Sequence, residues 1–104
     1  MEASYAIAWR EDDEPTAIGR LVLQPGRFSL IGIDEESRAV TREVARDDVG
    51  SVRPAPNGQR LRGARTAVVR LRSGHELALA SLDKPGTWLE LVNNLASGRA
   101  GGGA

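Results

Sequence analysis

The chain has 104 residues, a formal net charge of zero, 27% charged residues and 40% hydrophobic residues. That length suits one domain with a single small core, and this apolar share excludes an intrinsically disordered chain. The sequence has no cysteine, which excludes disulfides and thiolate metal sites.

Alternating apolar and polar residues predict three strands in the first third of the chain. The first is Ser4–Arg10, and it ends at a run of four acidic residues. The second and third are Ala17–Gln24 and Arg27–Ile33. Between them lie Pro25 and Gly26, the pair that suits a type II turn because its third position needs a positive φ. We therefore expect these two strands to form a hairpin.

Four further strands are predicted after the second acidic loop. Ala39–Arg46 and Val49–Arg53 are short and alternate weakly, and a proline-rich loop follows them. Ala64–Arg72 and His75–Ser81 alternate clearly, and Ser73-Gly74 between them suits a two-residue hairpin connection. The chain thus contains seven predicted strands.

From Asp83 onward the apolar period changes from two to 3.6, which predicts an amphipathic helix. Its apolar stripe consists of Trp88, Leu91, Val92 and Leu95. Leu89 widens that stripe in this interpretation, while Thr87 and Glu90 have the spacing of a capping box. Asp83 is an equally good start, and Gly98 suits a left-handed residue after the helix.

We expect residues 1–98 to form a single domain and residues 99–104 to form a disordered glycine-rich tail. The longest apolar run, Tyr5–Trp9, is far shorter than the ~20 residues that cross a bilayer. The N-terminus also lacks the basic and apolar regions of a signal peptide. A cytoplasmic location without a bound cofactor is the resulting expectation.

The element order resembles the pleckstrin-homology-like superfold, in particular its small bacterial members. The resemblance is carried by Gly19–Leu23, Asp47–Val52, Val68–Leu77 and Thr87–Val92, and it spans residues 4 to 97. It implies a mainly β fold, in which a seven-stranded antiparallel curled barrel is capped by one C-terminal α-helix. SH3-like and OB-type barrels fit less well, because neither normally needs seven strands and a terminal plug.

In that family a phosphoinositide site, where present, lies among the loops of the open end and uses basic side chains. The corresponding loops here carry an acidic mouth: Glu11, Asp12, Asp13, Glu14, Asp34, Glu35 and Glu36. These carboxylates would repel a phosphorylated headgroup, so we expect neither phosphoinositide nor membrane binding. A basic protein or peptide is the favoured partner. A divalent cation is a weaker alternative, because the spacing does not match an EF-hand loop.

Relatives of the fold also bind peptides between the fifth strand and the terminal helix, by adding a strand to an open edge. By that resemblance the groove would be lined by Val49, Ser51, Arg53, Glu90, Asn93 and Asn94. The competing hypothesis is a self-assembling structural module with no external ligand. Charge allows such self-association, because residues 1–36 hold eight carboxylates against three arginines, whereas residues 37–104 hold six against eleven basic residues.

A basic cluster spans the loop before the sixth strand and the outward side of that strand: Arg60, Arg62, Arg65, Arg70 and Arg72. Phosphate neutralisation by such residues drives nucleic-acid binding. However, the domain is not net basic, and no exposed aromatic residues interleave with these arginines. Nucleic acid is therefore the less favoured partner, and a solvated strand face is the simpler interpretation.

No pattern in the sequence predicts catalysis or a metal centre. His75 is the only histidine and lies beside a turn, and Ser73 lacks the oriented base that a nucleophile needs. Trp9 and Trp88 lie on predicted apolar faces, so we assign both to the core rather than to a ligand cage. The sequence therefore predicts a noncatalytic protein- or peptide-binding module.

Overall fold

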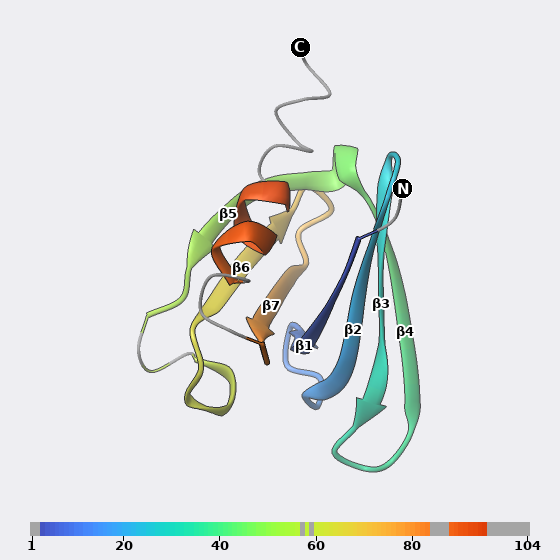
Figure 1. The fold of residues 1–104 in the computed structure, drawn as a ribbon, viewed down its shortest axis with the longest axis vertical. Coiled ribbons are helices and arrows are strands. Elements are labelled where there is room, and N and C mark those ends of the chain that lie inside the picture. Colours follow the sequence, from blue (N-terminus) through green and yellow to red (C-terminus); the bar gives the residue numbers. More distant parts are fainter. Residues whose placement is uncertain (1–2, 57, 59, 84–87, 96–104) are drawn as a thin grey trace.

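The computed structural model describes residues 3–56, 58, 60–83 and 88–95. Seven antiparallel strands form one sheet in the order β4-β3-β2-β1-β7-β6-β5, curled into a half-barrel as predicted (Figure 1). The strands are β1 (Ala3–Glu11), β2 (Ala17–Gln24), β3 (Arg27–Asp34), β4 (Ala39–Ala45), β5 (Val49–Pro54), β6 (Thr66–Leu71) and β7 (Glu76–Ser81). Two short 3-10 turns, Arg46–Asp48 and Leu61–Gly63, precede β5 and β6.

The C-terminal helix closes one end of the half-barrel. Residues 88–95 are helical, and Figure 1 shows them beside β5 and β6. Leu91 and Leu95 are 0% and 2% exposed and pack into the concave core. Leu89 is 51% exposed, so its assignment to the apolar stripe was wrong: it lies two positions from Leu91 and thus on another face of the helix. No described residues form a helix suited to crossing a membrane.

Several expectations lie outside the described residues. They are the helix start at Thr87, the left-handed residue Gly98, and the tail of residues 99–104.

A pair of glycines allows the sheet to curl tightly. Gly19 and Gly32 are cross-strand partners on β2 and β3. A Cβ atom at Gly19 would overlap the Ile31 carbonyl oxygen and lie 2.5 Å from the Gly32 Cα atom. The Trp9 indole lies near this pair, because its Nε1 donates to the Ile31 carbonyl at 3.1 Å, and a Cβ at Gly32 would lie 3.2 Å from that nitrogen. Small residues here permit the close strand approach that curvature needs.

Two details around β6 differ from the prediction. The strand begins at Thr66 rather than Ala64, because the preceding 3-10 turn buries Leu61 against the outer face of the sheet. The connection to β7 has three residues between Leu71 and His75, which hydrogen-bond each other, and its Gly74 has a φ of 103°. A glycine with positive φ is typical of such three-residue hairpin loops.

Candidate functional site

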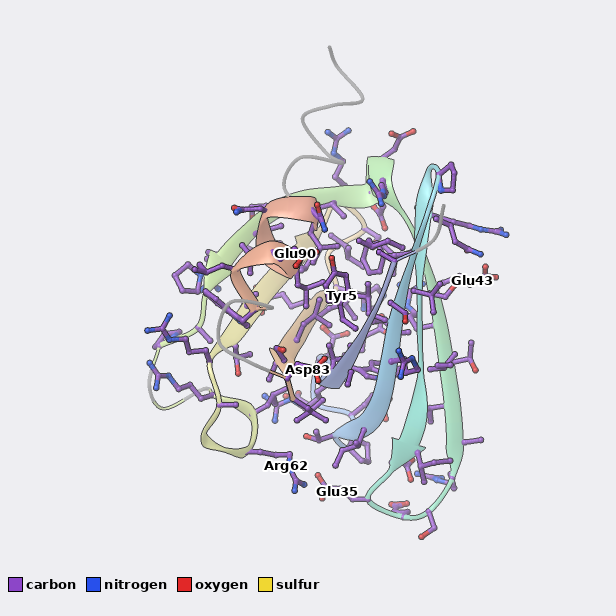
Figure 2. The ribbon with its side chains drawn as sticks, in the orientation of Figure 1. Tyr5, Glu35, Glu43, Arg62, Asp83 and Glu90 are labelled. Carbon is purple, nitrogen blue, oxygen red and sulfur yellow. The ribbon has the colours of Figure 1, made fainter. Side chains whose placement is uncertain are left out.

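The acidic loops lie together at the end of the half-barrel away from the helix. The β1–β2 loop and the β3–β4 loop touch, because the Thr16 amide donates to Glu35 Oε1 at 3.3 Å. The N-terminal half of β1 faces the helix instead. There the Tyr5 hydroxyl donates to Glu90 Oε1 at 3.2 Å and accepts from Asn94 Nδ2 at 2.6 Å, and burial raises the pKa of Tyr5 (Figure 2).

Asp34 serves the architecture of its loop. Its carboxylate is buried and accepts the amides of Glu36 and Arg38 at 2.8 and 2.9 Å, and it pairs with the Arg38 guanidinium at 3.3 Å. The backbone hydrogen bond from Arg38 is the main reason that the pKa of Asp34 lies below its usual value. Glu36 also pairs with Arg38, at 2.7 Å. Asp34 and Glu36 are therefore engaged within their own loop, and their carboxylates are not free to bind a basic partner protein.

Glu11, Asp12 and His75 form a compact group whose candidate ligand atoms lie within 4.8 Å of one another. The Asp12 carboxylate accepts the Glu76 amide at 3.0 Å and lies 2.6 Å from His75 Nδ1, so its pKa is lowered by that backbone bond first. The pKa of His75 is raised, chiefly by its hydrogen bond to Asp12. Glu11 is occupied by Arg42 Nε at 3.0 Å. The group could hold a divalent cation only by displacing these partners.

A pocket of about 420 Å³ opens between the two acidic loops and the start of β4. Its lining residues are Trp9, Glu11, Glu14, Pro15, Ala17, Asp34, Arg38, Ala39, Val40, Thr41 and Arg42. Glu11, Asp34, Arg38 and Arg42 already pair with one another or with Glu36. Among the described residues, the Glu14 side chain has no such partner. The pocket thus combines an apolar wall with one uncompensated carboxylate.

The six residues predicted to line a groove between β5 and the helix do not come together in the structure. Val49 is 1% exposed and belongs to the core. Ser51 and Arg53 lie on the outer face of the sheet, where Arg53 Nη2 is 3.7 Å from Glu76 Oε2. Glu90 and Asn94 bond to Tyr5 of β1, as described above, and Asn93 is exposed. The six residues therefore face three different regions.

The two edge strands, β4 and β5, differ in what they offer to an added strand. On β5, the Ala55 amide donates to the Thr66 carbonyl, so by alternation the backbone of Val52 and Pro54 faces the free edge. Pro54 has no N–H group to donate, and the register is irregular between Val49 and Ser51. Both features disfavour strand addition along β5.

On β4, the Asp34 amide donates to the Arg38 carbonyl, and the Arg46 amide donates to the Gly26 carbonyl. Even-numbered residues thus pair with β3, and the backbones of residues 39, 41, 43 and 45 face the free edge. The Glu43 carbonyl accepts from Arg42 Nη1 at 2.8 Å. In the described part of the chain nothing is bonded to this edge of Ala39 or Thr41, the two edge-facing residues of β4 that line the pocket.

Beside this open edge, the outer face of the sheet carries an exposed apolar row. Ile18, Ile31 and Ile33 are 42%, 40% and 52% exposed. Ile18 is the cross-strand partner of Ile33, which in turn faces Ala39 on β4. This surface was not among the sites predicted from the sequence. The sequence of β3 could have indicated this surface. There Phe28 and Leu30 occupy one face and Ile31 and Ile33 the other, so both faces of the strand are apolar.

The arginines of the basic cluster lie in four places. Arg70, on the outer face of β6, lies 3.7 Å from Glu76 Oε2. Arg60 and Arg65 instead line a separate pocket of about 210 Å³ near Trp88. Arg62 is exposed on the 3-10 turn, and Arg72 lies in the β6–β7 loop. The five arginines therefore do not form one continuous strand face.

Neither family models nor curated proteins match the chain. Among solved structures, it is similar to the C-terminal domain of an unknown protein from Leishmania infantum. The TM-score is 0.65 at 13% sequence identity, over 90% of this chain and 82% of that one. At this identity the similarity concerns the fold alone.

Proposed function

We propose that the chain is a noncatalytic peptide-binding module that receives an extended segment of a partner protein along β4. The observation that carries the proposal is the meeting of an open strand edge and a pocket on the same residues, Ala39 and Thr41. Backbone hydrogen bonds to the edge would supply affinity, and a side chain entering the pocket would supply specificity.

The pocket and the outer face define the chemistry of that segment. Alternate side chains of an added strand point to opposite faces of the sheet. On the inner side, a lysine or arginine would pack its aliphatic stem against Trp9 and Val40 and present its charge to Glu14. On the outer side, a β-branched residue would extend the row formed by Ile33 and Ala39. The expected partner is an extended segment in which basic and β-branched residues alternate.

We also propose that the half-barrel is pleckstrin-homology-like and belongs to a bacterial cytoplasmic protein. Seven consecutive strands followed by a helix whose Leu91 and Leu95 enter the core support the first part. The resemblance of Gly19–Leu23, Asp47–Val52, Val68–Leu77 and Thr87–Val92 to small bacterial members of that superfold supports the second part.

The test uses a synthetic peptide of alternating valine and lysine, labelled for fluorescence anisotropy. Thr41→Pro removes an edge-facing N–H that makes no internal hydrogen bond, so the fold should persist and peptide binding should be lost. Thr41→Val is the matched control, because it keeps the N–H and a similar shape, and it should bind normally. Equal binding by both variants would refute the use of this edge.

A second pair of variants tests the pocket. Glu14→Gln should weaken binding of the lysine peptide, whereas Asp13→Asn should not, because Asp13 does not line the pocket. Replacing lysine by glutamate in the peptide should abolish binding to the wild type. If the wild type sediments as a dimer and Thr41→Pro as a monomer, the occupant of the edge is a second copy. That result would favour the self-assembling module.

A further inference from the structure

Three arginines, Arg60, Arg62 and Arg65, gather in the loop before β6. Arg27, Arg38, Arg42, Arg53 and Arg70 all form ion pairs with carboxylates. No carboxylate of the described residues lies within 4.0 Å of the charged nitrogens of Arg60, Arg62 or Arg65. This loop therefore carries three arginines without an ion-pair partner among the described residues, beside the strands at the opposite edge of the sheet from β4.

Two of these arginines line a pocket that has no acidic residue among its described lining residues. The pocket of about 210 Å³ is bounded by Pro54, Ala55, Arg60, Arg65, Thr66 and Trp88. The Arg65 guanidinium carbon lies 5.9 Å from the centre of the Trp88 ring, a cation–π distance that orients the cation before any ligand arrives. Two guanidinium groups beside an uncharged wall can neutralise an anion with two charges.

Trp88, which lines this pocket, carries a further hydrogen-bond donor, its indole N–H group. Its Nε1 is buried and has no hydrogen-bond partner in the part of the chain that the structure describes. A buried donor without an acceptor is costly. A rotation of the ring that turns this N–H toward the pocket would break no hydrogen bond among the described residues. The indole N–H and both guanidinium groups are all donors, which again favours an anion.

We propose that Arg60, Arg65 and Trp88 form a binding site for a phosphate dianion, separate from the β4 edge. The phosphate would be either a free ion or a phosphorylated side chain, which present the same charge and acceptor oxygens. Arg60 and Arg65 supply charge-assisted hydrogen bonds, and the Trp88 ring holds Arg65 in place. A carboxylate carries one charge and would therefore neutralise only one of the two guanidinium groups.

The test follows the two indole N–H signals in ¹H–¹⁵N spectra during titration with inorganic phosphate. The Trp88 signal should shift saturably, whereas the Trp9 signal should not, because Trp9 Nε1 already donates to the Ile31 carbonyl. Sodium chloride at equal ionic strength and sodium acetate are the control titrations. A phosphoserine peptide forms a second arm. Tighter binding than inorganic phosphate would identify the phosphorylated side chain as the source, and equal or weaker binding would identify the free ion.

Three variants complete the design. Arg60→Gln and Arg65→Gln should each weaken phosphate binding about tenfold, the loss expected for one charge-assisted hydrogen bond. Arg72→Gln removes the same charge outside the pocket and should leave the affinity unchanged. The proposal is overturned if chloride reproduces the shift, if the shift never saturates, or if Arg72→Gln weakens binding as much as the other two. None of these three substitutions lies in β4, so all three variants should still bind the peptide at β4. The peptide assay therefore tests the proposed function separately from the phosphate site.

Discussion

Gly19→Ala should be among the most damaging single-methyl changes in the sheet. The added Cβ would lie 2.5 Å from the Gly32 Cα atom and overlap the Ile31 carbonyl. Both neighbours are backbone, so β2 and β3 must separate where the sheet curls. Overpacking usually costs ~1–3 kcal/mol, and rigid neighbours place this site at the upper end, at about 3 kcal/mol. That is a large part of the ~5–15 kcal/mol that stabilises a typical domain.

Urea unfolding, followed by tryptophan fluorescence, measures this loss. A decrease of about 3 kcal/mol corresponds to a fall in melting temperature of roughly 10–20 °C for a domain of this size. Gly58→Ala is the matched control, because no heavy atom lies within 4 Å of its added Cβ, and its stability should stay within ~1 kcal/mol of the wild type. If Gly19→Ala were as stable as this control, the close approach of the two strands would not be what sets the curl.

Three further predictions concern the loops and the helix. The pKa of His75 is raised in the folded state, so its link to Asp12 stabilises the fold fully below the ordinary pKa of 6.5. This stabilisation should be lost as the pH rises through the pKa of His75 in the folded protein. Urea midpoints measured against pH should show the loss, and Asp12→Asn should make the midpoint depend less on pH. Asp34 has a lowered pKa, so Asp34→Asn should reduce the melting temperature at neutral pH, and the difference should shrink as acid protonates the wild-type carboxylate. Leu91→Ala should cost about 2–5 kcal/mol in urea unfolding, whereas the exposed Leu89→Ala should cost less than ~1 kcal/mol; equal losses would contradict the observed helix face.

The strands were predictable because burial on one face leaves a period of two in the sequence. Tyr5, Ile7 and Trp9 recur at every second position of the first predicted strand, and all three are buried. Leu61 was not predictable in this way, because it is buried by a 3-10 turn that folds onto the outer face, and no local period marks such a contact. The exposure of Leu89 was also not predicted. Its position within an apolar run suggested burial, but on the helix it lies on a different face from Leu91.

The chemistry of the loops was harder to predict than the strands. The number of carboxylates in the loops predicted a strongly acidic mouth. The charge that such a surface presents to a partner also depends on ion pairs with residues distant in the sequence. Arg42 reaches Glu11 across 31 positions, and His75 reaches Asp12 across 63. Asp34 is directed inward to its own loop. Among the carboxylates that line the pocket, only Glu14 then remains without a partner in the described residues. The sequence alone does not distinguish Glu14 from the neighbouring acidic residues.

The contrast between the two edges of the sheet strengthens the case for a partner at β4. Exposed edges invite pairing with other chains, and proteins usually guard them with proline, bulges or charge. β5 follows this rule with Pro54 and its irregular register. β4 has neither between Ala39 and Thr41, and it adjoins the exposed Ile33. An edge left open beside apolar surface is a liability unless it is occupied, so selection for solubility should have closed it. Its openness is explained if a partner strand completes the sheet there.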